Sequence, residues 1–129
     1  MLVDHPDEWD AFLNVLQQCT SIVTLDIIGN YSDEDLAMFV NQIEKLAAVL
    51  PQLPNLRTLD LGNNDITEGL EELCNVLPQC TSLSRLDLSD NCLRAKNMED
   101  LMNTMQRCTH IKELFIDNHH AFLSNADMV

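Results

Sequence analysis

Basic residues are scarce in this chain of 129 residues. Seven Lys and Arg stand against 21 Asp and Glu, which gives a formal net charge of −14. This balance argues against a nucleic-acid-binding protein, because neutralising phosphates requires Lys and Arg. It also argues against docking on an anionic membrane. A protein partner with basic groups would be attracted to such a surface, and the alternative is that the acidity serves only solubility.

Long apolar runs and glycine are also missing. No stretch approaches the roughly 20 apolar residues that span a bilayer. The first residues, MLVDHPDEWD, lack the basic and apolar regions of a secretory signal. The three glycines, at positions 29, 62 and 69, form no Gly-rich phosphate loop. We therefore expect a cytoplasmic protein, with secretion into a host cell as an effector as the alternative.

Cysteine is too rare for a disulfide framework and wrongly spaced for a metal site. The chain has five cysteines, an odd number, and no Cys-x-x-Cys pair. Its four histidines are His5, His110, His119 and His120, which complete no zinc-binding pattern. A nucleophilic cysteine would have to be exposed beside a base, and no pattern here predicts that arrangement. We predict a protein that is not an enzyme and that uses no cofactor and no metal.

What the sequence does contain is a repeat. Four segments share the pattern of an apolar residue, two others, an apolar residue, one other and an apolar residue, and they begin at positions 22, 56, 83 and 111. These starts are 34, 27 and 28 residues apart. An Asn follows the first three segments, at Asn30, Asn64 and Asn91. A near-constant period in this range is typical of a solenoid.

The motifs LRTLDLGNNDI and LSRLDLSDNCL within these segments resemble leucine-rich repeats, specifically those of the ribonuclease-inhibitor-like class with about 28 residues per repeat. The alternating leucines independently predict short strands, and apolar residues at helical spacing between them predict helices. We expect an α/β fold, a short leucine-rich-repeat solenoid with a parallel sheet on its concave face and helices on its convex face. The Asn residues are expected to bind backbone groups where the chain leaves each strand.

The organisation follows from this register. Residues 1–129 form one leucine-rich-repeat domain, with an N-terminal capping helix in 1–21, four strand-bearing units in 22–119 and a short C-terminal tail or partial cap in 120–129. The segment SDEDLAMFVNQIEKLAAVL predicts a long helix in the first connection, capped by Ser32, whereas Thr67 and Asn97 are expected to cap the next two helices. The tail offers only Phe122 and Leu123 as cover, so the last strand edge is available to a partner or to another copy.

The cysteines occupy a repeated slot. Cys19, Cys80 and Cys108 each precede the first strand residue by three, and Leu53 fills the same slot. A position that accepts Cys or Leu is a small apolar core position, so we expect buried free thiols there. Equivalent cysteines of adjacent units would still lie within disulfide range. Cys92, at a strand exit, is expected to be the most exposed.

The remaining candidates lie on the outward side of the strands. One column is expected to contain Asp26, Asp60, Asp87 and Phe115, with Arg85, Glu113 and Asp117 in the columns beside it. These seven residues are our predicted partner-binding site. The alternative for the Asp residues is a solvated position common to such repeats. The alternative for Phe115 is that the tail or a further repeat covers it.

The sequence thus predicts a non-catalytic module that binds a protein through an acidic concave sheet. One alternative is the recognition fragment of a larger innate-immune receptor or pathogen effector. Another, from the fold alone, is a GTPase-activating leucine-rich-repeat protein that uses Arg94, which follows the SDNCL motif.

Overall fold

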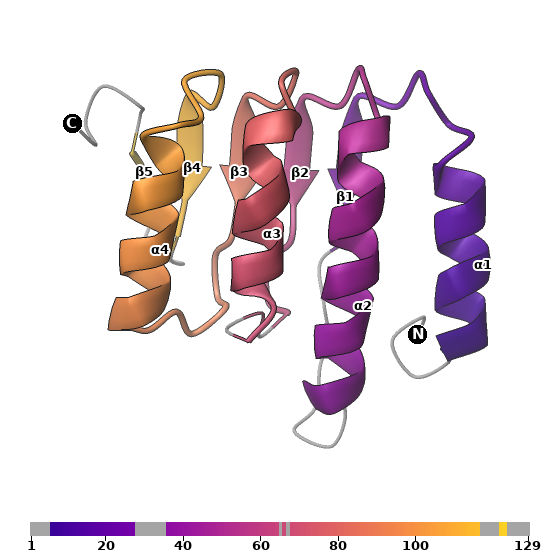
Figure 1. Ribbon diagram of the computed structural model, residues 1–129, viewed down its shortest axis with the longest axis horizontal. Helices are drawn as coiled ribbons and strands as arrows, with labels where there is room; N and C mark the ends of the chain where they lie inside the picture. Colours follow the sequence, from indigo (N-terminus) through magenta and orange to yellow (C-terminus); the bar gives the residue numbers. More distant parts are fainter. Residues whose placement is uncertain (1–5, 28–35, 65, 67, 117–121, 124–129) are drawn as a thin grey trace.

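A sheet and a row of helices form the two layers of the molecule (Figure 1). The computed structural model describes residues 6–27, 36–64, 66, 68–116 and 122–123. Its elements are, in order, α1 (Pro6–Leu16), β1 (Thr24–Asp26), α2 (Leu36–Val49), η3 (Leu50–Gln52), β2 (Thr58–Asp60), α3 (Leu70–Val76), η4 (Leu77–Gln79), β3 (Arg85–Asp87), α4 (Ala95–Met105), β4 (Glu113–Phe115) and β5 (Phe122–Leu123). Helices and strands alternate, so the α/β solenoid predicted from the repeat is confirmed.

The sheet has the order β1-β2-β3-β4-β5, and its first four strands are parallel. Leu25, Leu59, Leu86 and Leu114 are aligned across these strands, which is the register that the repeat predicts. β5 pairs with β4 in the antiparallel direction. The edge of β4 that we expected to be open is therefore occupied by the tail, and this part of the prediction is corrected.

The leucines that define the repeat form the core. Leu59, Leu86 and Leu114 have no exposed surface, whereas both neighbours of each lie at the solvent side of its strand. This alternation follows from strand geometry, because successive side chains point to opposite faces. The inward leucines meet the helices, and the outward residues form a separate polar face.

The asparagine positions are structural, as expected. Asn91 is 1% exposed, and its Nδ2 donates hydrogen bonds to the carbonyls of Leu61, Leu88 and Ser89 at 2.9, 3.0 and 3.2 Å. Its Oδ1 accepts from the backbone N–H groups of Asn64 and Ile66 at 2.8 and 3.3 Å. A buried amide thus joins two adjacent repeats at the point where backbone groups leave the ladder.

Asn64 repeats this role one unit earlier. Its Nδ2 donates to the carbonyls of Ile27 and Leu61 at 2.6 and 3.0 Å. The first member of the series, Asn30, lies outside the described residues. The series runs perpendicular to the strands and stabilises the stacking of one unit on the next.

The N-cap residues of α3 and α4 differ from those predicted from the sequence. Asn97 is not the N-cap of α4, because the helix starts earlier, after Arg94. The Asn97 side chain instead accepts a hydrogen bond of 2.9 Å from the Arg94 N–H. α3 follows Gly69, and Thr67 and Ser32 lie outside the described residues. The longer helix expected in the first connection is present, since α2 has 14 residues and α3 has 7.

The helices pack closely at one point. A Cβ atom on Gly69 would lie 2.8 Å from Cγ2 and 3.0 Å from Cβ of Ile43, which is 1% exposed. Glycine at the start of α3 therefore lets this helix approach α2. At the other end of the row, α1 packs on α2, with Trp9 buried and its Nε1 donating to the Gln42 carbonyl at 3.2 Å. No helix among the described residues is long and apolar enough to cross a membrane.

Candidate protein-binding face

Three aspartates lie in a row across the outer face of the sheet, and we call Asp26, Asp60 and Asp87 the acidic strip. Asp26 is paired with Asp60, and Asp60 with Asp87, in the parallel register. Neighbouring strands are about 4.8 Å apart, so the three carboxylates follow one another at about that interval. Asp26 is exposed and the other two are half-buried. The predicted acidic column is therefore present at these three positions.

Two members of the strip also hold the backbone in place. Oδ1 of Asp60 accepts a hydrogen bond of 3.0 Å from the Gly62 N–H, and Oδ1 of Asp87 accepts one of 2.9 Å from the Ser89 N–H. This two-residue spacing is the usual geometry of an Asx turn. Sequence reasoning missed this role, although the recurrence of Asp two residues before the turn is a signal that could have indicated it.

The carboxyl group of Asp60, at the centre of the acidic strip, is in an environment that disfavours its charged form. Burial raises the pKa of the Asp60 carboxyl, and the charges of Asp87 and Asp26 raise it further. The Gly62 N–H and the Arg85 guanidinium act in the opposite direction without cancelling the effect. The centre of the strip thus has a net negative potential that an added cation would relieve.

Arg85 is held beside the strip by two neighbours. Its Nη1 lies 2.7 Å from Oε2 of Glu113, and its Cζ lies 4.3 Å from the centre of the Phe115 ring. An arginine over an aromatic ring is a favourable cation–π arrangement. Phe115 is half-buried and is paired with Phe122 of β5. Phe115, at the end of the column, is therefore in contact with Arg85 and lies on the strand next to β5.

The structure brings six of the seven predicted site residues onto one face. Asp26, Asp60, Arg85, Asp87, Glu113 and Phe115 all lie on strands β1 to β4. Asp117 lies outside the described residues, as do His119 and His120. The strand residues can be compared directly with the prediction, and each lies at its expected register position.

The cysteine slot is buried in the later units but not in the first. Cys80 and Cys108 are 7% and 0% exposed, and Leu53 in the same slot is 4% exposed. Cys19 is exposed, so its predicted burial is wrong. A slot residue is covered by the unit before it, and no described unit precedes Cys19. Cys92 is exposed, as expected.

All five cysteines are free thiols. Burial, together with the neighbouring Cys108, raises the pKa of Cys80 to about 11. Burial likewise raises the pKa of Cys108 to about 11, and it raises that of Cys74. Thiols with such pKa values are almost entirely protonated at neutral pH and are poor nucleophiles.

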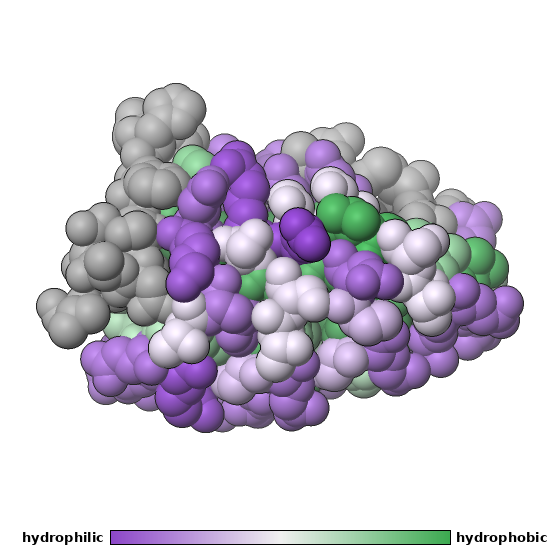
Figure 2. All heavy atoms as spheres, turned by 90° about the horizontal axis from the view of Figure 1, so that it is seen from above, coloured by the Kyte–Doolittle hydropathy of each residue, from purple (hydrophilic) through white to green (hydrophobic). Residues whose placement is uncertain are grey.

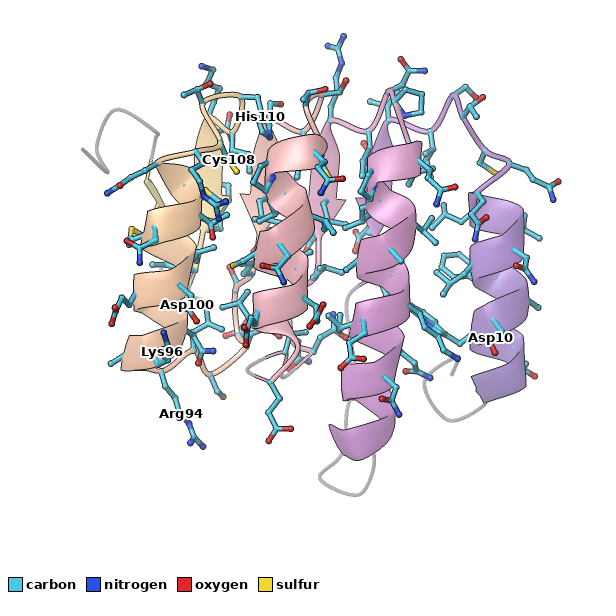
Figure 3. All side chains as sticks on the ribbon, viewed as in Figure 1. Asp10, Arg94, Lys96, Asp100, Cys108 and His110 are labelled. Carbon is cyan, nitrogen blue, oxygen red and sulfur yellow. The ribbon has the colours of Figure 1, made fainter. Side chains whose placement is uncertain are left out.

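The helix side carries exposed ion pairs. Lys45 of α2 lies 2.8 Å from Asp10 of α1, and Lys96 lies 2.8 Å from Asp100 within α4. Figure 3 shows Arg94 pointing away from the lower end of α4, and Cys108 between α4 and the strands. Within the part of the chain that the structure describes, no group of three His, Cys, Asp or Glu side chains is arranged to hold a metal ion.

Comparison with known proteins supports the repeat assignment. No curated protein matches this chain. Residues 54–101 match the family model described as Leucine Rich repeats (2 copies). The matched stretch includes β2, α3, η4 and β3, together with both motifs quoted above. Residues 54–101 are therefore leucine-rich repeats, and the fold of the chain is an α/β fold of the leucine-rich-repeat type.

Proposed function

We propose that this chain is a non-catalytic module that binds basic side chains of a protein partner through the acidic strip, with Arg85, Glu113 and Phe115 at one end of the contact. Leucine-rich repeats generally mediate protein–protein interaction, and the proposal adds the face and the chemistry of the partner. The observation that carries it is the in-register row of three aspartates, whose central member has a pKa raised by burial and by both neighbours.

A partner's Lys or Arg side chains would reduce the repulsion within the strip. Like charges on adjacent strands destabilise a sheet, so their recurrence is unfavourable unless another group compensates. Arg85 supplies only part of this compensation, because Glu113 also binds its guanidinium. Electrostatic complementarity of this kind mainly increases the association rate and the specificity of a complex.

Phe115 and Arg85 add an aromatic and a cationic side chain to the otherwise acidic face. Aromatic and arginine side chains contribute most to the binding energy of many interfaces. The stack of Arg85 on the Phe115 ring fixes both side chains before binding, which reduces the entropy lost on association. We propose that the partner places an apolar residue against this stack and its basic residues along the strip.

The test is quantitative capture from a cell extract by wild type and by a variant with Asp26→Asn, Asp60→Asn and Asp87→Asn. Asparagine removes each charge while its side-chain oxygen can still accept the turn hydrogen bonds from Gly62 and Ser89. Exposed charge pairs contribute about 0.2–1 kcal/mol each, so we expect roughly tenfold weaker capture of the partner.

The matched control is Glu44→Gln, Glu72→Gln and Glu99→Gln. These exposed residues lie on α2, α3 and α4, and the control changes the net charge by the same amount. Wild-type recovery is expected for the control. Equal loss in both variants would indicate a response to net charge alone, and no loss in either would contradict binding at the strip.

The second candidate function rests on Arg94. This residue is exposed before α4 and extends beyond the lower end of α4 in Figure 3, as a residue that reaches into a GTPase site would have to. Under this hypothesis the chain stimulates GTP hydrolysis, and Arg94→Ala abolishes the stimulation while Lys96→Ala, an exposed control two residues away, retains it. A GTPase that hydrolyses GTP equally fast with either variant would contradict it.

Three finer assignments remain proposals of the same kind. We propose that the repeats belong to the ribonuclease-inhibitor-like class, because the spacings of 27 and 28 residues between positions 56, 83 and 111 match its repeat length. We propose a cytoplasmic location, with secretion into a host cell as the alternative. A role as the recognition fragment of an innate-immune receptor or pathogen effector also fits a binding module, and localisation of a tagged full-length protein would distinguish these settings.

A further inference from the structure

The outer face of α1 exposes a position that two of the three later helices bury. The repeat register aligns Val15 with Val49 of α2, Val76 of α3 and Thr104 of α4. Val49 and Thr104 are 3% and 2% exposed and Val76 is half-buried, whereas Val15 is 62% exposed. Val49 borders the groove between α1 and α2, and Thr104 borders the groove between α3 and α4. Each of the two buried residues therefore faces the helix that precedes its own.

The same difference occurs at the cysteine slot. Cys19 is exposed, although Leu53 and Cys108 in the equivalent position are 4% and 0% exposed. Figure 2, which looks onto the loops that lead from helices to strands, shows green, hydrophobic residues among the purple toward the α1 end at the right. This end of the array thus presents a surface of the kind that the chain buries between its own units.

The exposed positions form one strip along α1. Ala11, Asn14, Val15, Gln18 and Cys19 are all exposed and recur at intervals of three and four residues, so they share one face of the helix and of the turn that follows it. We call these five residues the α1 outer strip. Their equivalents in α2 include Lys45, Ala48 and Val49, which line the groove against α1.

The α1 outer strip is neutral in a strongly acidic protein. No Asp, Glu, Lys or Arg occurs from Ala11 to Leu25, although the net charge of the chain is −14. Two copies of such a protein repel each other over most of their surfaces. A neutral and partly apolar strip is a part of the described surface where a second copy can approach without bringing like charges into contact.

We propose that two copies of this chain associate through the α1 outer strip, with α1 of one copy antiparallel to α1 of the other. A twofold contact requires one patch that complements itself, and a neutral strip of apolar and amide side chains meets this requirement. α1 of the second copy would lie against the exposed side of α1 of the first copy, as α1 itself lies against α2 within one chain. The opposite end of the sheet offers no equivalent open position on β4, because β5 is paired there.

The association is expected to be weak and dependent on concentration. A contact made by one helix from each copy buries less than the roughly 1,200 Å² of a standard specific interface. The chain alone has a mass of 14.6 kDa. Sedimentation equilibrium should therefore give a mass near this value at low concentration that rises toward twice this value as the concentration increases.

A charge placed in the strip tests the location. Val15→Asp is expected to remain monomeric over the full concentration range, because two facing copies would bring the new carboxylates together. Val15 is 62% exposed, so the substitution should leave the fold intact, which circular dichroism can verify. The matched control is Asn103→Asp, which adds the same charge at an exposed position on α4 and should associate like wild type.

Cross-linking provides a second readout that uses the native thiols. Cys19 and Cys92 are the exposed cysteines, and only Cys19 lies in the α1 outer strip. A short bis-maleimide should therefore link two wild-type chains, and the linked species should disappear in Cys19→Ser and persist in Cys92→Ser. The proposal is overturned if wild type remains at the monomer mass up to about 1 mM, the weak end of specific association. It is equally overturned if Val15→Asp associates like wild type, or if the cross-link depends on Cys92.

Discussion

Replacement of Asn91 by alanine should be among the most destabilising single changes in this chain. The side chain is 1% exposed and makes five hydrogen bonds, three as a donor through Nδ2 and two as an acceptor through Oδ1. Alanine leaves the backbone N–H groups of Asn64 and Ile66 without this acceptor. It also removes a donor from three carbonyls of two different repeats.

The magnitude follows from the number of buried groups affected. A buried polar group that loses its partner costs about 1–3 kcal/mol, and single substitutions rarely exceed about 4–5 kcal/mol because the structure relaxes. We expect Asn91→Ala to lower the free energy of unfolding by about 3–4 kcal/mol. Asn91→Asp should also be strongly destabilising, because it keeps an acceptor but places a carboxylate against the carbonyls that now receive hydrogen bonds.

Urea unfolding followed by the fluorescence of Trp9, the single tryptophan, measures this directly because Trp9 is buried in the folded chain. Asn103→Ala is the control. Asn103 is exposed on α4, and its replacement should change the free energy of unfolding by no more than about 0.5 kcal/mol. A loss below about 1 kcal/mol for Asn91→Ala would refute the role assigned to the buried amides.

Three further outcomes are expected. Gly69→Ala should destabilise by about 1–3 kcal/mol through overpacking against Ile43, and Ile43→Ala in the same chain should cost less than the sum of both single changes in urea unfolding. The pKa of Asp60 should fall in Asp87→Asn when followed by NMR, and stability should decline as pH rises through this pKa, because a raised pKa means that the folded chain holds the proton more tightly than the unfolded chain. An Asp60 pKa that is unchanged in the variant would contradict the coupling along the strip. Native protein should react with iodoacetamide at the two exposed cysteines and at all five only in denaturant, as counted by mass spectrometry, and rapid native reaction at Cys108 would show that its burial is misassigned.

The sequence predicted whatever the repeat register determines. The alternating leucines, the parallel pairing of β1 to β4 and the outward positions of Asp60 and Asp87 all follow from one periodic pattern. The structural role of Asn91 was predictable for the same reason. Burial of Cys80 followed from the fact that leucine replaces cysteine at an equivalent position.

Features that depend on contacts with neighbouring elements, rather than on the sequence repeat, were not predictable. Cys19 occupies the repeated slot but is exposed, because the unit before a slot residue covers it and no described unit precedes Cys19. Asn97 has a residue type that favours caps, yet α4 begins earlier and uses it to accept the Arg94 N–H. The pairing of β5 with β4 is a long-range contact with no local signature in the sequence.

The side-chain network around Phe115 shows the same limit. Register placed Arg85 and Glu113 in one column and Phe115 in the next, but the stacking of Arg85 on the ring and its ion pair with Glu113 are choices of rotamer. They alter the site chemically, because an arginine that is already paired contributes less to neutralising the acidic strip.

The location of the binding face can be measured directly by NMR with the isotope-labelled chain and the partner captured from extract. Binding at the sheet predicts that the largest amide shift changes occur in β1, β2, β3 and β4, around Asp26, Asp60, Asp87 and Phe115, and that they weaken as salt is added. Amides on the exposed faces of α2, α3 and α4 should change little. Shift changes confined to those helices, with the strand residues unaffected, would contradict the proposal that the acidic strip receives the partner.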